Sequence, residues 1–240
     1  MKMQKIQIGI ASPTYNEAEN INYFIENILT LKDIYIINIC FVDDESQDNT
    51  LKIIESYKKE FNNINVIKRK KLKSTQVYSA YHNGLKWLYE NTKSEYFAQI
   101  DSDNVCDINV IKQAFENLTL HKDLDLVKLS KYKDKNKDER SFVRRYLSKI
   151  YTTICRFLYK KEISDYSTGI RFYNLHLVNK LIKRKRKFSS PIGLLDDLLW
   201  IINNNFKFQE ISFKINERKF GKSFFKISLL FSLGIQFIYC

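Results

Sequence analysis

The feature that most constrains the fold is the regular alternation, through the first half of the chain, of short apolar runs with segments of helical periodicity. The clearest apolar run, Tyr35–Val42, is continuous and rich in β-branched residues, which is typical of a strand buried on both faces of a parallel sheet. Strand, loop and helix repeated in this way predict an α/β fold with a mostly parallel central sheet flanked by helices. The predicted strands are Lys5–Ala11, Tyr35–Val42, Asn65–Arg69, Tyr96–Ile100 and Asp125–Ser130, and the predicted helices are Ile21–Leu31 (with Asn20 as a possible N-cap), Thr50–Lys59, Gln76–Tyr89 and Ile108–Leu118.

The second half of the chain is less regular. Lys131–Arg140 is a charged loop, and Ser141–Leu158 has the pattern of a basic amphipathic helix. Asp165–Tyr173 is polar and contains glycine, which predicts a turn. The remaining predicted elements are the helices Leu175–Lys183 and Pro191–Asn203 and the strand Phe206–Ile215.

Composition predicts one globular domain. The 240 residues are 44% hydrophobic and 28% charged, which argues against disorder, and no repeat or low-complexity linker divides them. We expect the domain to occupy residues 1–222, followed by a C-terminal apolar segment at residues 223–240. That segment, which contains Ile227–Tyr239, could dock on the core, lie in a membrane interface or contact a partner.

Targeting signals and cysteines point to a reducing compartment. The N-terminal apolar run is too short for a signal peptide, and no stretch reaches the roughly 18 apolar residues that a spanning helix needs. The four cysteines are too widely spaced for a zinc site, and nothing in their pattern indicates disulfides. We therefore expect a cytoplasmic protein.

The formal net charge of +13 would attract nucleic acid, anionic lipid headgroups or phosphorylated substrates. The 15 tyrosines and 17 phenylalanines would suit nucleic-acid binding, but they fall mainly in apolar runs and no nucleic-acid motif accompanies them. We expect no nucleic acid as a partner, and charge alone does not choose between an anionic membrane surface and phosphorylated substrates.

Polar clusters follow the first, second and fourth predicted strands, at Thr14–Glu17, Asp43–Ser46 and Asp101–Asp103. Ligands of open parallel sheets bind beyond the carboxyl ends of the strands, so these clusters predict an active site at that edge. Carboxylates two residues apart, as in Asp101-Ser102-Asp103, can share a hard cation such as Mg²⁺ or Mn²⁺. Such a cation would neutralise the diphosphate that leaves when a nucleotide sugar reacts. The alternative for each cluster is helix capping or a solvated turn.

The three segments that contain these clusters are SPTYNEAENI, FVDDESQDNT and QIDSDN. They resemble the consecutive signatures of inverting family 2 glycosyltransferases with the GT-A fold. Three later segments, RRYLSKIYTTICRFLY, DYSTGIRFY and ISFKINERKFGKS, are similar to segments of polyprenol (dolichyl) phosphate mannose synthases. The similarity runs in order from about Ile8 to Ser223. It implies a metal-dependent hexosyltransferase that moves a sugar from a nucleotide sugar, such as GDP-mannose, to a polyprenyl or dolichyl phosphate.

The resemblance implies roles on the donor side for residues at matching positions. Asp101 and Asp103 would hold Mg²⁺ or Mn²⁺ with the donor diphosphate, and Asp103 would be catalytic. The positions that would line the nucleotide pocket are Pro13, Tyr15, Glu17, Asp43 and Asp101.

The resemblance also implies roles around the transferred phosphate. Lys131, Arg144 and Arg218 would grip donor or acceptor phosphate, and Arg218 would also take part in catalysis. Asp196 falls where the family has a catalytic acidic residue, and Asp197 is the alternative by a slip of one residue.

Three departures from the family pattern leave the sugar open. Val105 stands where the family often has Gln, KSTQV replaces a Gly-rich stretch, and Lys131 replaces an Arg. A related hypothesis is therefore a family 2 enzyme that uses another donor, such as a UDP-sugar, to extend a surface glycan. A phosphate acceptor is ionised and needs no strong base, whereas a hydroxyl acceptor would need Asp196 or Asp197 as general base. The lipid acceptor would place the enzyme peripherally on the inner face of a membrane.

Overall fold

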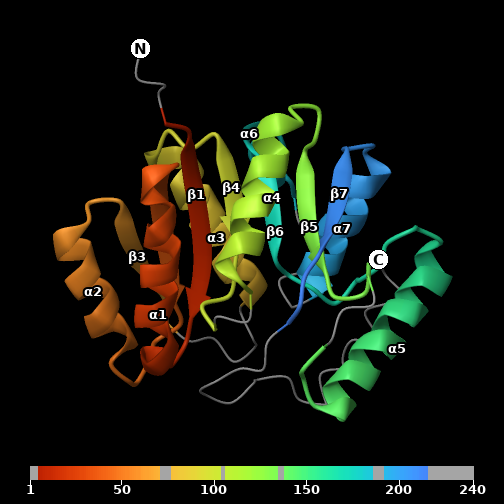
Figure 1. Cartoon of the computed structure of the whole chain (residues 1–240), viewed down its shortest axis with the longest axis horizontal. Helices are drawn as coiled ribbons and strands as arrows, with labels where there is room; N and C mark the ends of the chain where they lie inside the picture. The colour runs from red at the N-terminus through yellow and green to blue at the C-terminus, as the bar shows by residue number, and fades with distance from the viewer. Residues whose placement is uncertain (1–4, 71–76, 104–105, 135–137, 186–191, 216–240) are drawn as a thin grey trace.

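The computed structural model describes residues 5–70, 77–103, 106–134, 138–185 and 192–215, and its described strands form one sheet in the order β3-β2-β1-β4-β6-β5-β7 (Figure 1). The strands are β1 (Gln7–Thr14), β2 (Ile36–Asp43), β3 (Ile64–Lys68), β4 (Tyr96–Gln99), β5 (Leu126–Ser130), β6 (Arg171–Asn174) and β7 (Phe208–Ser212). The helices are α1 (Ala18–Leu29), α2 (Thr50–Glu60), α3 (Val77–Asn91), α4 (Ile108–Leu120), α5 (Phe142–Tyr159), α6 (Leu175–Lys183) and α7 (Ile192–Asn203), and the 3₁₀ turn η1 (Thr30–Asp33) follows α1.

The sheet is parallel except at β6, which runs antiparallel to both β4 and β5. The register pairs Thr14 at the end of β1 with Asp43 at the end of β2. The carboxyl ends of these strands therefore lie at one level of the same edge. The predicted α/β architecture, a mostly parallel sheet between helices, is confirmed.

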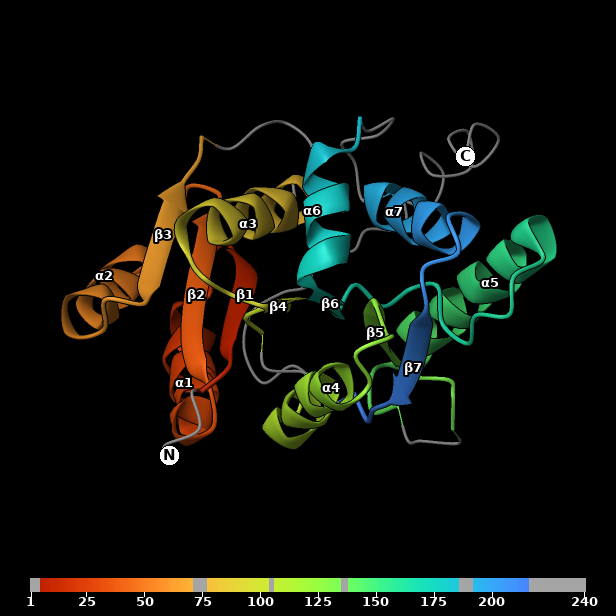
Figure 2. The same cartoon turned by 90° about the horizontal axis from the view of Figure 1, so that it is seen from above.

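Helices cover both faces of the sheet. Figure 2 shows α1 and α4 on one face and α3, α6 and α7 on the other, and two separate hydrophobic clusters fill these interfaces. The packing of α3 on β1 is close enough to require a glycine, since a Cβ on Gly84 would lie 2.8 Å from the Cβ of Ala11. This contact explains a glycine in the middle of a helix, where it otherwise lowers stability.

Two predicted boundaries near the start of the chain are wrong. β1 continues past Ala11 to Thr14, because polar Ser12 and Thr14 are buried inside the strand. Helix α1 begins at Ala18, so Asn20 is not its N-cap. Asn20 instead lies buried in the first turn, where its Nδ2 donates to Glu17 Oε2 at 2.8 Å.

The prediction of a turn at Asp165–Tyr173 misses β6, which begins at Arg171. The strand is four residues long and starts with a charged residue, so neither length nor hydropathy marks it. It fits between β4 and β5 and pairs Arg171 with both Gln99 and Lys128. This insertion separates the ends of β4 and β5 by two strand spacings, roughly 10 Å.

The amphipathic helix predicted at Ser141–Leu158 is α5, and the helix predicted at Leu175–Lys183 is α6 with the same bounds. The other predicted helices and strands are present with shifted ends. The apolar segment at residues 223–240 lies outside the described residues. Within the described part of the chain, no helix combines the length and the hydropathy that crossing a bilayer requires.

Candidate active site

The three polar clusters that follow β1, β2 and β4 are hydrogen-bonded to one another. Thr14 Oγ1 donates to Asp43 Oδ2 at 2.9 Å, which joins the ends of β1 and β2. Ser102 Oγ donates to the Pro13 carbonyl at 3.0 Å, which joins β1 to the loop after β4. The clusters therefore share one edge of the sheet, as the sequence predicts.

Within the pair Asp43-Asp44, the structure separates a buried carboxylate from an exposed one. Asp43 is fully buried and accepts hydrogen bonds from Thr14 Oγ1 and from the backbone N and Oγ of Ser46. Asp44 keeps 17% of its side chain exposed and pairs with Arg69. Its Oδ1 lies 2.5 Å from Arg69 Nη2 and 2.7 Å from Arg69 Nε. Asp43 thus braces the loop, and Asp44 with Arg69 presents the polar groups at its surface.

The other residues predicted for the nucleotide pocket differ in exposure. Pro13 and Tyr15 are partly exposed at the end of β1. Glu17 is buried, receives the hydrogen bond from Asn20, and donates its backbone N–H to Thr50 Oγ1 at 2.8 Å. Its carboxylate is therefore engaged in holding the start of α1.

Asp48 ties the starts of two helices together. Its Oδ2 accepts from the backbone N–H of Ala18 at 3.0 Å, and its Oδ1 accepts from that of Thr50 at 2.9 Å. Partial burial acts to raise the pKa of Asp48, but the hydrogen bonds from Thr50 and Ala18 outweigh it and lower that pKa. The first two loops are rigidly joined as a result.

Asp101 and Asp103 lie directly after β4, and both are partly exposed. Tyr81 Oη, from α3, donates to Asp101 Oδ1 at 2.5 Å. Burial and the neighbouring Asp101 carboxylate raise the pKa of Tyr81, so the hydroxyl remains a donor. The hydrogen bond orients the Asp101 carboxylate at the end of β4.

The Asp101 and Asp103 carboxylates are the hard oxygen ligands that Mg²⁺ and Mn²⁺ prefer. No group of three or more His, Cys, Asp or Glu side chains that could hold a metal occurs among the described residues. The donor set fits a cation that takes its remaining ligands from phosphate oxygens and water, as Mg²⁺ does when it binds with a nucleotide.

Replacing Tyr81 with Phe is expected to weaken Mn²⁺ affinity by about tenfold, because ligand-orienting partners typically contribute that much. Calorimetric titration with Mn²⁺ in the presence of nucleoside diphosphate measures the effect. Tyr78→Phe, in which a buried hydroxyl on the same helix is removed, is the matched control. Equal Mn²⁺ affinity of Tyr81→Phe and wild type would contradict the positioning role.

Lys131, which the sequence assigns to phosphate binding, belongs to a buried charge cluster. Its Nζ lies 2.8 Å from Asp165 Oδ2, and both side chains are almost completely buried. Lys128 Nζ, also fully buried, lies 3.5 Å from Glu210 Oε1 and donates to the Asp165 carbonyl. Lys131 is therefore held by Asp165 at the end of β5.

The pKa values of this cluster follow from burial opposed by charge pairing. Burial would raise the pKa of Asp165, but the ammoniums of Lys131 and Lys128 hold it well below its usual range. Burial lowers the pKa of Lys128 to about 8, although Asp165 and Glu210 act to raise it. The cluster tolerates loss of a cation better than loss of the Asp165 carboxylate.

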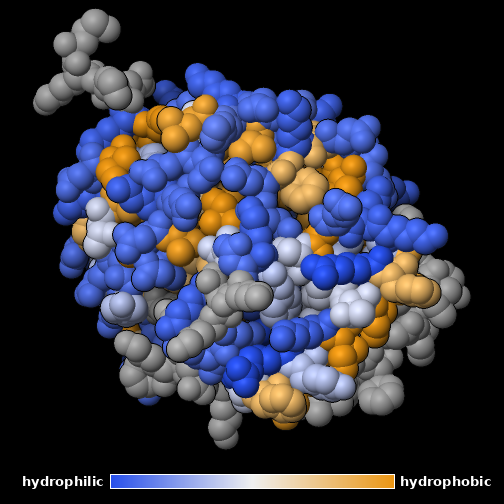
Figure 3. All heavy atoms as spheres, turned by 45° about the vertical axis from the view of Figure 1, so that its right-hand side comes forward, coloured by the Kyte–Doolittle hydropathy of each residue, from blue (hydrophilic) through white to orange (hydrophobic). Residues whose placement is uncertain are grey.

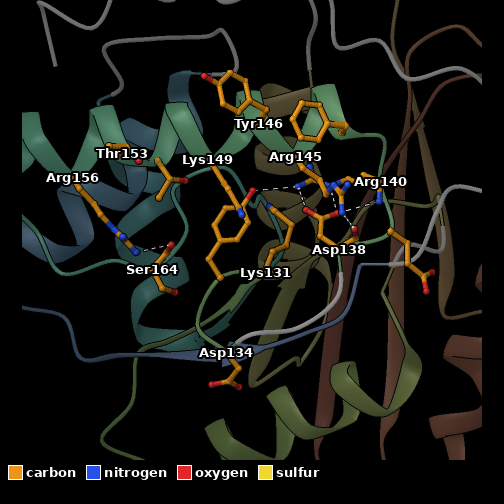
Figure 4. Close-up of a pocket in the computed structure, with 14 residues that line it drawn as sticks. Lys131, Asp134, Asp138, Arg140, Arg145, Tyr146, Lys149, Thr153, Arg156 and Ser164 are labelled. Atoms are coloured by element: carbon orange, nitrogen blue, oxygen red, sulfur yellow. Dashed lines mark hydrogen bonds and ion pairs between the residues drawn. The ribbon is translucent and has the colours of Figure 1, made fainter.

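A pocket of about 1060 Å³ lies between α5 and the loop after β5 (Figure 4). Arg145 and Lys149 extend from α5 toward that loop, whereas Arg156 extends toward Ser164. Arg144 does not line the pocket, although the sequence assigns it to phosphate binding, and the neighbouring Arg145 does. The basic residues that line the pocket are Lys131, Arg140, Arg145, Lys149 and Arg156, and the acidic ones are Asp134, Asp138 and Glu139.

Asp196 and Asp197 lie on α7, and one arginine binds both. Arg184 Nη2 lies 2.7 Å from Asp196 Oδ2, and its Nη1 lies 2.7 Å from Asp197 Oδ1. The guanidinium also lies over the Trp200 ring, 5.3 Å from its centroid. The predicted catalytic carboxylate is therefore paired with a cation in this state of the site. Arg218 lies outside the described residues.

Sequence reasoning missed several residues that shape the site. Tyr81 fits the apolar stripe of its helix, so the pattern gave no sign of its contact with Asp101. Asp165 stands in the DYSTGIRFY segment, whose resemblance was a usable signal. Arg184 is one of several basic residues after α6, and nothing in the sequence distinguishes it.

Comparison with known proteins decides the family, because the model of Glycosyl transferase family 2 matches residues 10–182. The chain belongs to glycosyl transferase family 2. The match spans the strands and loops that carry Asp43, Asp101, Asp103 and Asp165. This family 2 chain has the α/β GT-A fold that the sequence predicts.

An uncharacterized protein of Methanocaldococcus jannaschii is 30% identical to the family 2 chain over 135 residues, which are 56% of this chain and 50% of the relative. The chain spans about half the length of that relative. Solved structures of glucosyl-3-phosphoglycerate synthase from Mycobacterium tuberculosis share the fold. One, in complex with Mn²⁺, UDP and glucosyl-3-phosphoglycerate, has a TM-score of 0.71 at 14% identity over 97% of this chain and 77% of its own. Another, with Mg²⁺ and UDP, has a TM-score of 0.68 at 15% identity over the same shares.

Proposed function

We propose that this family 2 glycosyltransferase moves a sugar from a nucleotide-sugar donor to a polyprenyl phosphate. The observation that carries the proposal is the placement of Asp101 and Asp103 on the same sheet edge as Lys131, which lines the basic pocket under α5. The two carboxylates suit a metal-bound diphosphate, and the basic pocket suits a phosphorylated acceptor. The strands that precede these two sites, β4 and β5, lie roughly 10 Å apart.

On the donor side, Asp101 and Asp103 would hold Mg²⁺ or Mn²⁺, which supplies positive charge to the departing diphosphate. Support comes from the hard carboxylate ligands and from structural relatives crystallised with Mn²⁺ or Mg²⁺ and UDP. Tyr15 and the Asp44–Arg69 pair would line the nucleotide pocket, with Pro13 at its floor. In this proposal Asp43 and Glu17 hold the loops and do not contact the nucleotide.

On the acceptor side, Arg145 and Lys149 would bind the lipid phosphate. A phosphate oxygen attacks the anomeric carbon as the bond from that carbon to the nucleoside diphosphate breaks, and the diphosphate leaves with the bonding electrons. The attacking oxygen is already ionised near neutral pH, so no general base is needed. Positioning and charge neutralisation supply the catalysis.

A second candidate is transfer from a UDP-sugar to a hydroxyl acceptor of a glycan. Support comes from the fold likeness to a synthase crystallised with UDP-glucose. In this case Asp196 or Asp197 would act as general base. Their pairing with Arg184 disfavours it, because the guanidinium occupies carboxylate oxygens that would have to accept the hydroxyl proton.

Turnover of a panel of GDP- and UDP-sugars with Mn²⁺, measured with polyprenyl phosphate or with soluble sugars, separates the two candidates. We expect sugar transfer only with the lipid phosphate. We also expect Arg145→Ala to raise the KM for polyprenyl phosphate about tenfold, as the loss of one charge-assisted contact implies. Arg144→Ala, one residue away but outside the pocket, is the matched control. Full activity on a soluble sugar, without stimulation by polyprenyl phosphate, would favour the hydroxyl acceptor.

A lipid acceptor requires the enzyme to work at a membrane. We therefore place it peripherally on the inner, cytoplasmic face of a membrane, where anionic headgroups attract a protein of net charge +13.

A further inference from the structure

Helix α5 is amphipathic in the reverse sense from a helix that covers a core. Most of its large apolar side chains are exposed to solvent, including Ile150 at 38% and Phe157 at 81% exposure. Its only buried residues are Thr152 and Cys155. Helices of globular proteins normally turn the apolar stripe toward the core, so folding of this domain does not explain the orientation of α5.

The inward side of α5 is joined to the domain by packing of Tyr151, Cys155 and Tyr159 and by polar contacts. Ser148 Oγ lies 2.6 Å from Ser167 Oγ and accepts from Tyr132 Oη at 2.8 Å. Arg156 donates from Nε to the Ile163 carbonyl at 2.7 Å and from Nη2 to the Ser164 carbonyl at 2.9 Å. These contacts fix which side of the helix faces outward.

The outward apolar residues form one continuous stripe. Successive residues of a helix are about 100° apart, so residues three, four and seven apart fall on one face. Figure 3 shows hydrophobic side chains gathered along the lower right of the molecule, where α5 lies. The exposed members of the stripe are Val143, Tyr146, Ile150, Ile154, Phe157 and Leu158.

Cations border this stripe. Helix α5 contains four arginines and lysines and no acidic residue. Arg144 and Lys149 lie on opposite flanks of the stripe, each about 110° from its centre, whereas Arg145 lies farther round the helix, on the pocket side. A stripe of large apolar side chains between basic flanks matches helices that lie in the interface of an anionic bilayer. A second copy of the chain would instead bring two basic helices together, which is unfavourable.

We propose that α5 is the membrane-docking element of this protein, with its apolar stripe immersed between the headgroups of an anionic bilayer. The inference rests on the proposed function for its purpose, since docking through α5 brings the phosphate-binding flank of the pocket to headgroup level. A polyprenyl phosphate could then present its phosphate to Arg145 and Lys149 while its chain stays in the bilayer.

The test uses the full chain and phosphatidylcholine vesicles with and without phosphatidylglycerol. Ile150→Glu and Phe157→Glu, which lie outside the pocket lining, are each expected to weaken binding to the anionic vesicles about tenfold or more. Leu120→Glu, at an exposed leucine on α4 with 77% exposure, should bind as wild type does. Unchanged vesicle binding by both α5 variants would overturn the proposal, and so would loss of a dimer without loss of vesicle binding.

A second measurement does not depend on loss of binding. In Phe157→Trp, lipids brominated on their acyl chains should quench the new tryptophan, and wild type gives the contribution of the two native tryptophans. Absence of additional quenching on bound vesicles would overturn the proposal.

Sugar transfer to a short-chain polyprenyl phosphate in detergent separates the docking role of α5 from the proposed function, because the α5 variants should retain wild-type turnover there. Wild type could also make no product in detergent while the α5 variants bind vesicles more weakly than wild type does. In that case the proposed function is wrong, but the role of α5 in membrane docking is retained.

Discussion

Asp103→Asn is expected to lower metal-dependent donor turnover by about a thousandfold, because the metal's charge contributes several kcal/mol to stabilising the leaving diphosphate. Asn is close to Asp in size but carries no charge, and the two carboxylates after β4 are the proposed ligands of the cation. The measurement is release of nucleoside diphosphate from the preferred nucleotide sugar across a Mn²⁺ titration. A right-shifted and lowered Mn²⁺ curve is the expected form of the loss.

The matched control is Asp107→Asn, four positions along the same segment. Asp107 caps α4 by accepting from the Asn109 backbone N–H at 2.7 Å, and Asn caps a helix about as well as Asp does. This variant should turn over donor as wild type does. Two results would contradict metal-dependent catalysis at this site. One is wild-type turnover by Asp103→Asn, and the other is full turnover by the wild-type enzyme in the presence of a chelator.

Asp165→Asn is expected to destabilise the fold by about 3–5 kcal/mol, the usual result of removing one partner of a buried ion pair. Asp165 is fully buried between Lys131 and Lys128, and without its charge both ammoniums remain in the interior. The free energy of unfolding, from urea denaturation followed by circular dichroism, measures the loss. The double variant Asp165→Asn with Lys131→Met should recover part of it, because one of the stranded charges is then gone.

The stabilising contribution of Asp165 is expected to decrease as the pH falls. The pKa of Asp165 is lower in the folded protein than in the unfolded chain. Its contribution is therefore fully present above the unfolded pKa of about 4, and it is lost as the pH falls toward the folded pKa. Wild type should lose more stability on acidification than Asp165→Asn does. Equal losses, or a stable Asp165→Asn, would show that the cluster does not depend on this carboxylate.

The sequence predicted the alternation of strands and helices because hydrophobic periodicity is a local property. It also predicted that Thr14, Asp43 and Asp103 would share an edge, since the carboxyl ends of parallel strands necessarily do so. It could not predict β6, because a four-residue strand that begins with a buried arginine has no periodic signal. Pairing with β4 and β5 over long separations stabilises that strand.

The roles of individual charged residues depend on contacts that periodicity does not contain. Asp165 lies 34 positions from Lys131, and Arg184 lies 12 positions from Asp196. Arg144 and Arg145 are equivalent as sequence, but a rotation of about 100° on the helix sends only Arg145 to the pocket. The same limit applies to α5. The sequence pattern predicted its apolar face but not that this face would point to solvent.

A crystal grown with Mn²⁺ and the nucleoside diphosphate of the preferred donor tests the central claim most directly. Anomalous scattering locates the metal independently of any assumption about its ligands. The account predicts a manganese peak roughly 2.1 Å from a carboxylate oxygen of Asp101 or Asp103, with the diphosphate completing its coordination. Manganese or nucleotide bound elsewhere, with these two carboxylates facing only solvent, would contradict it.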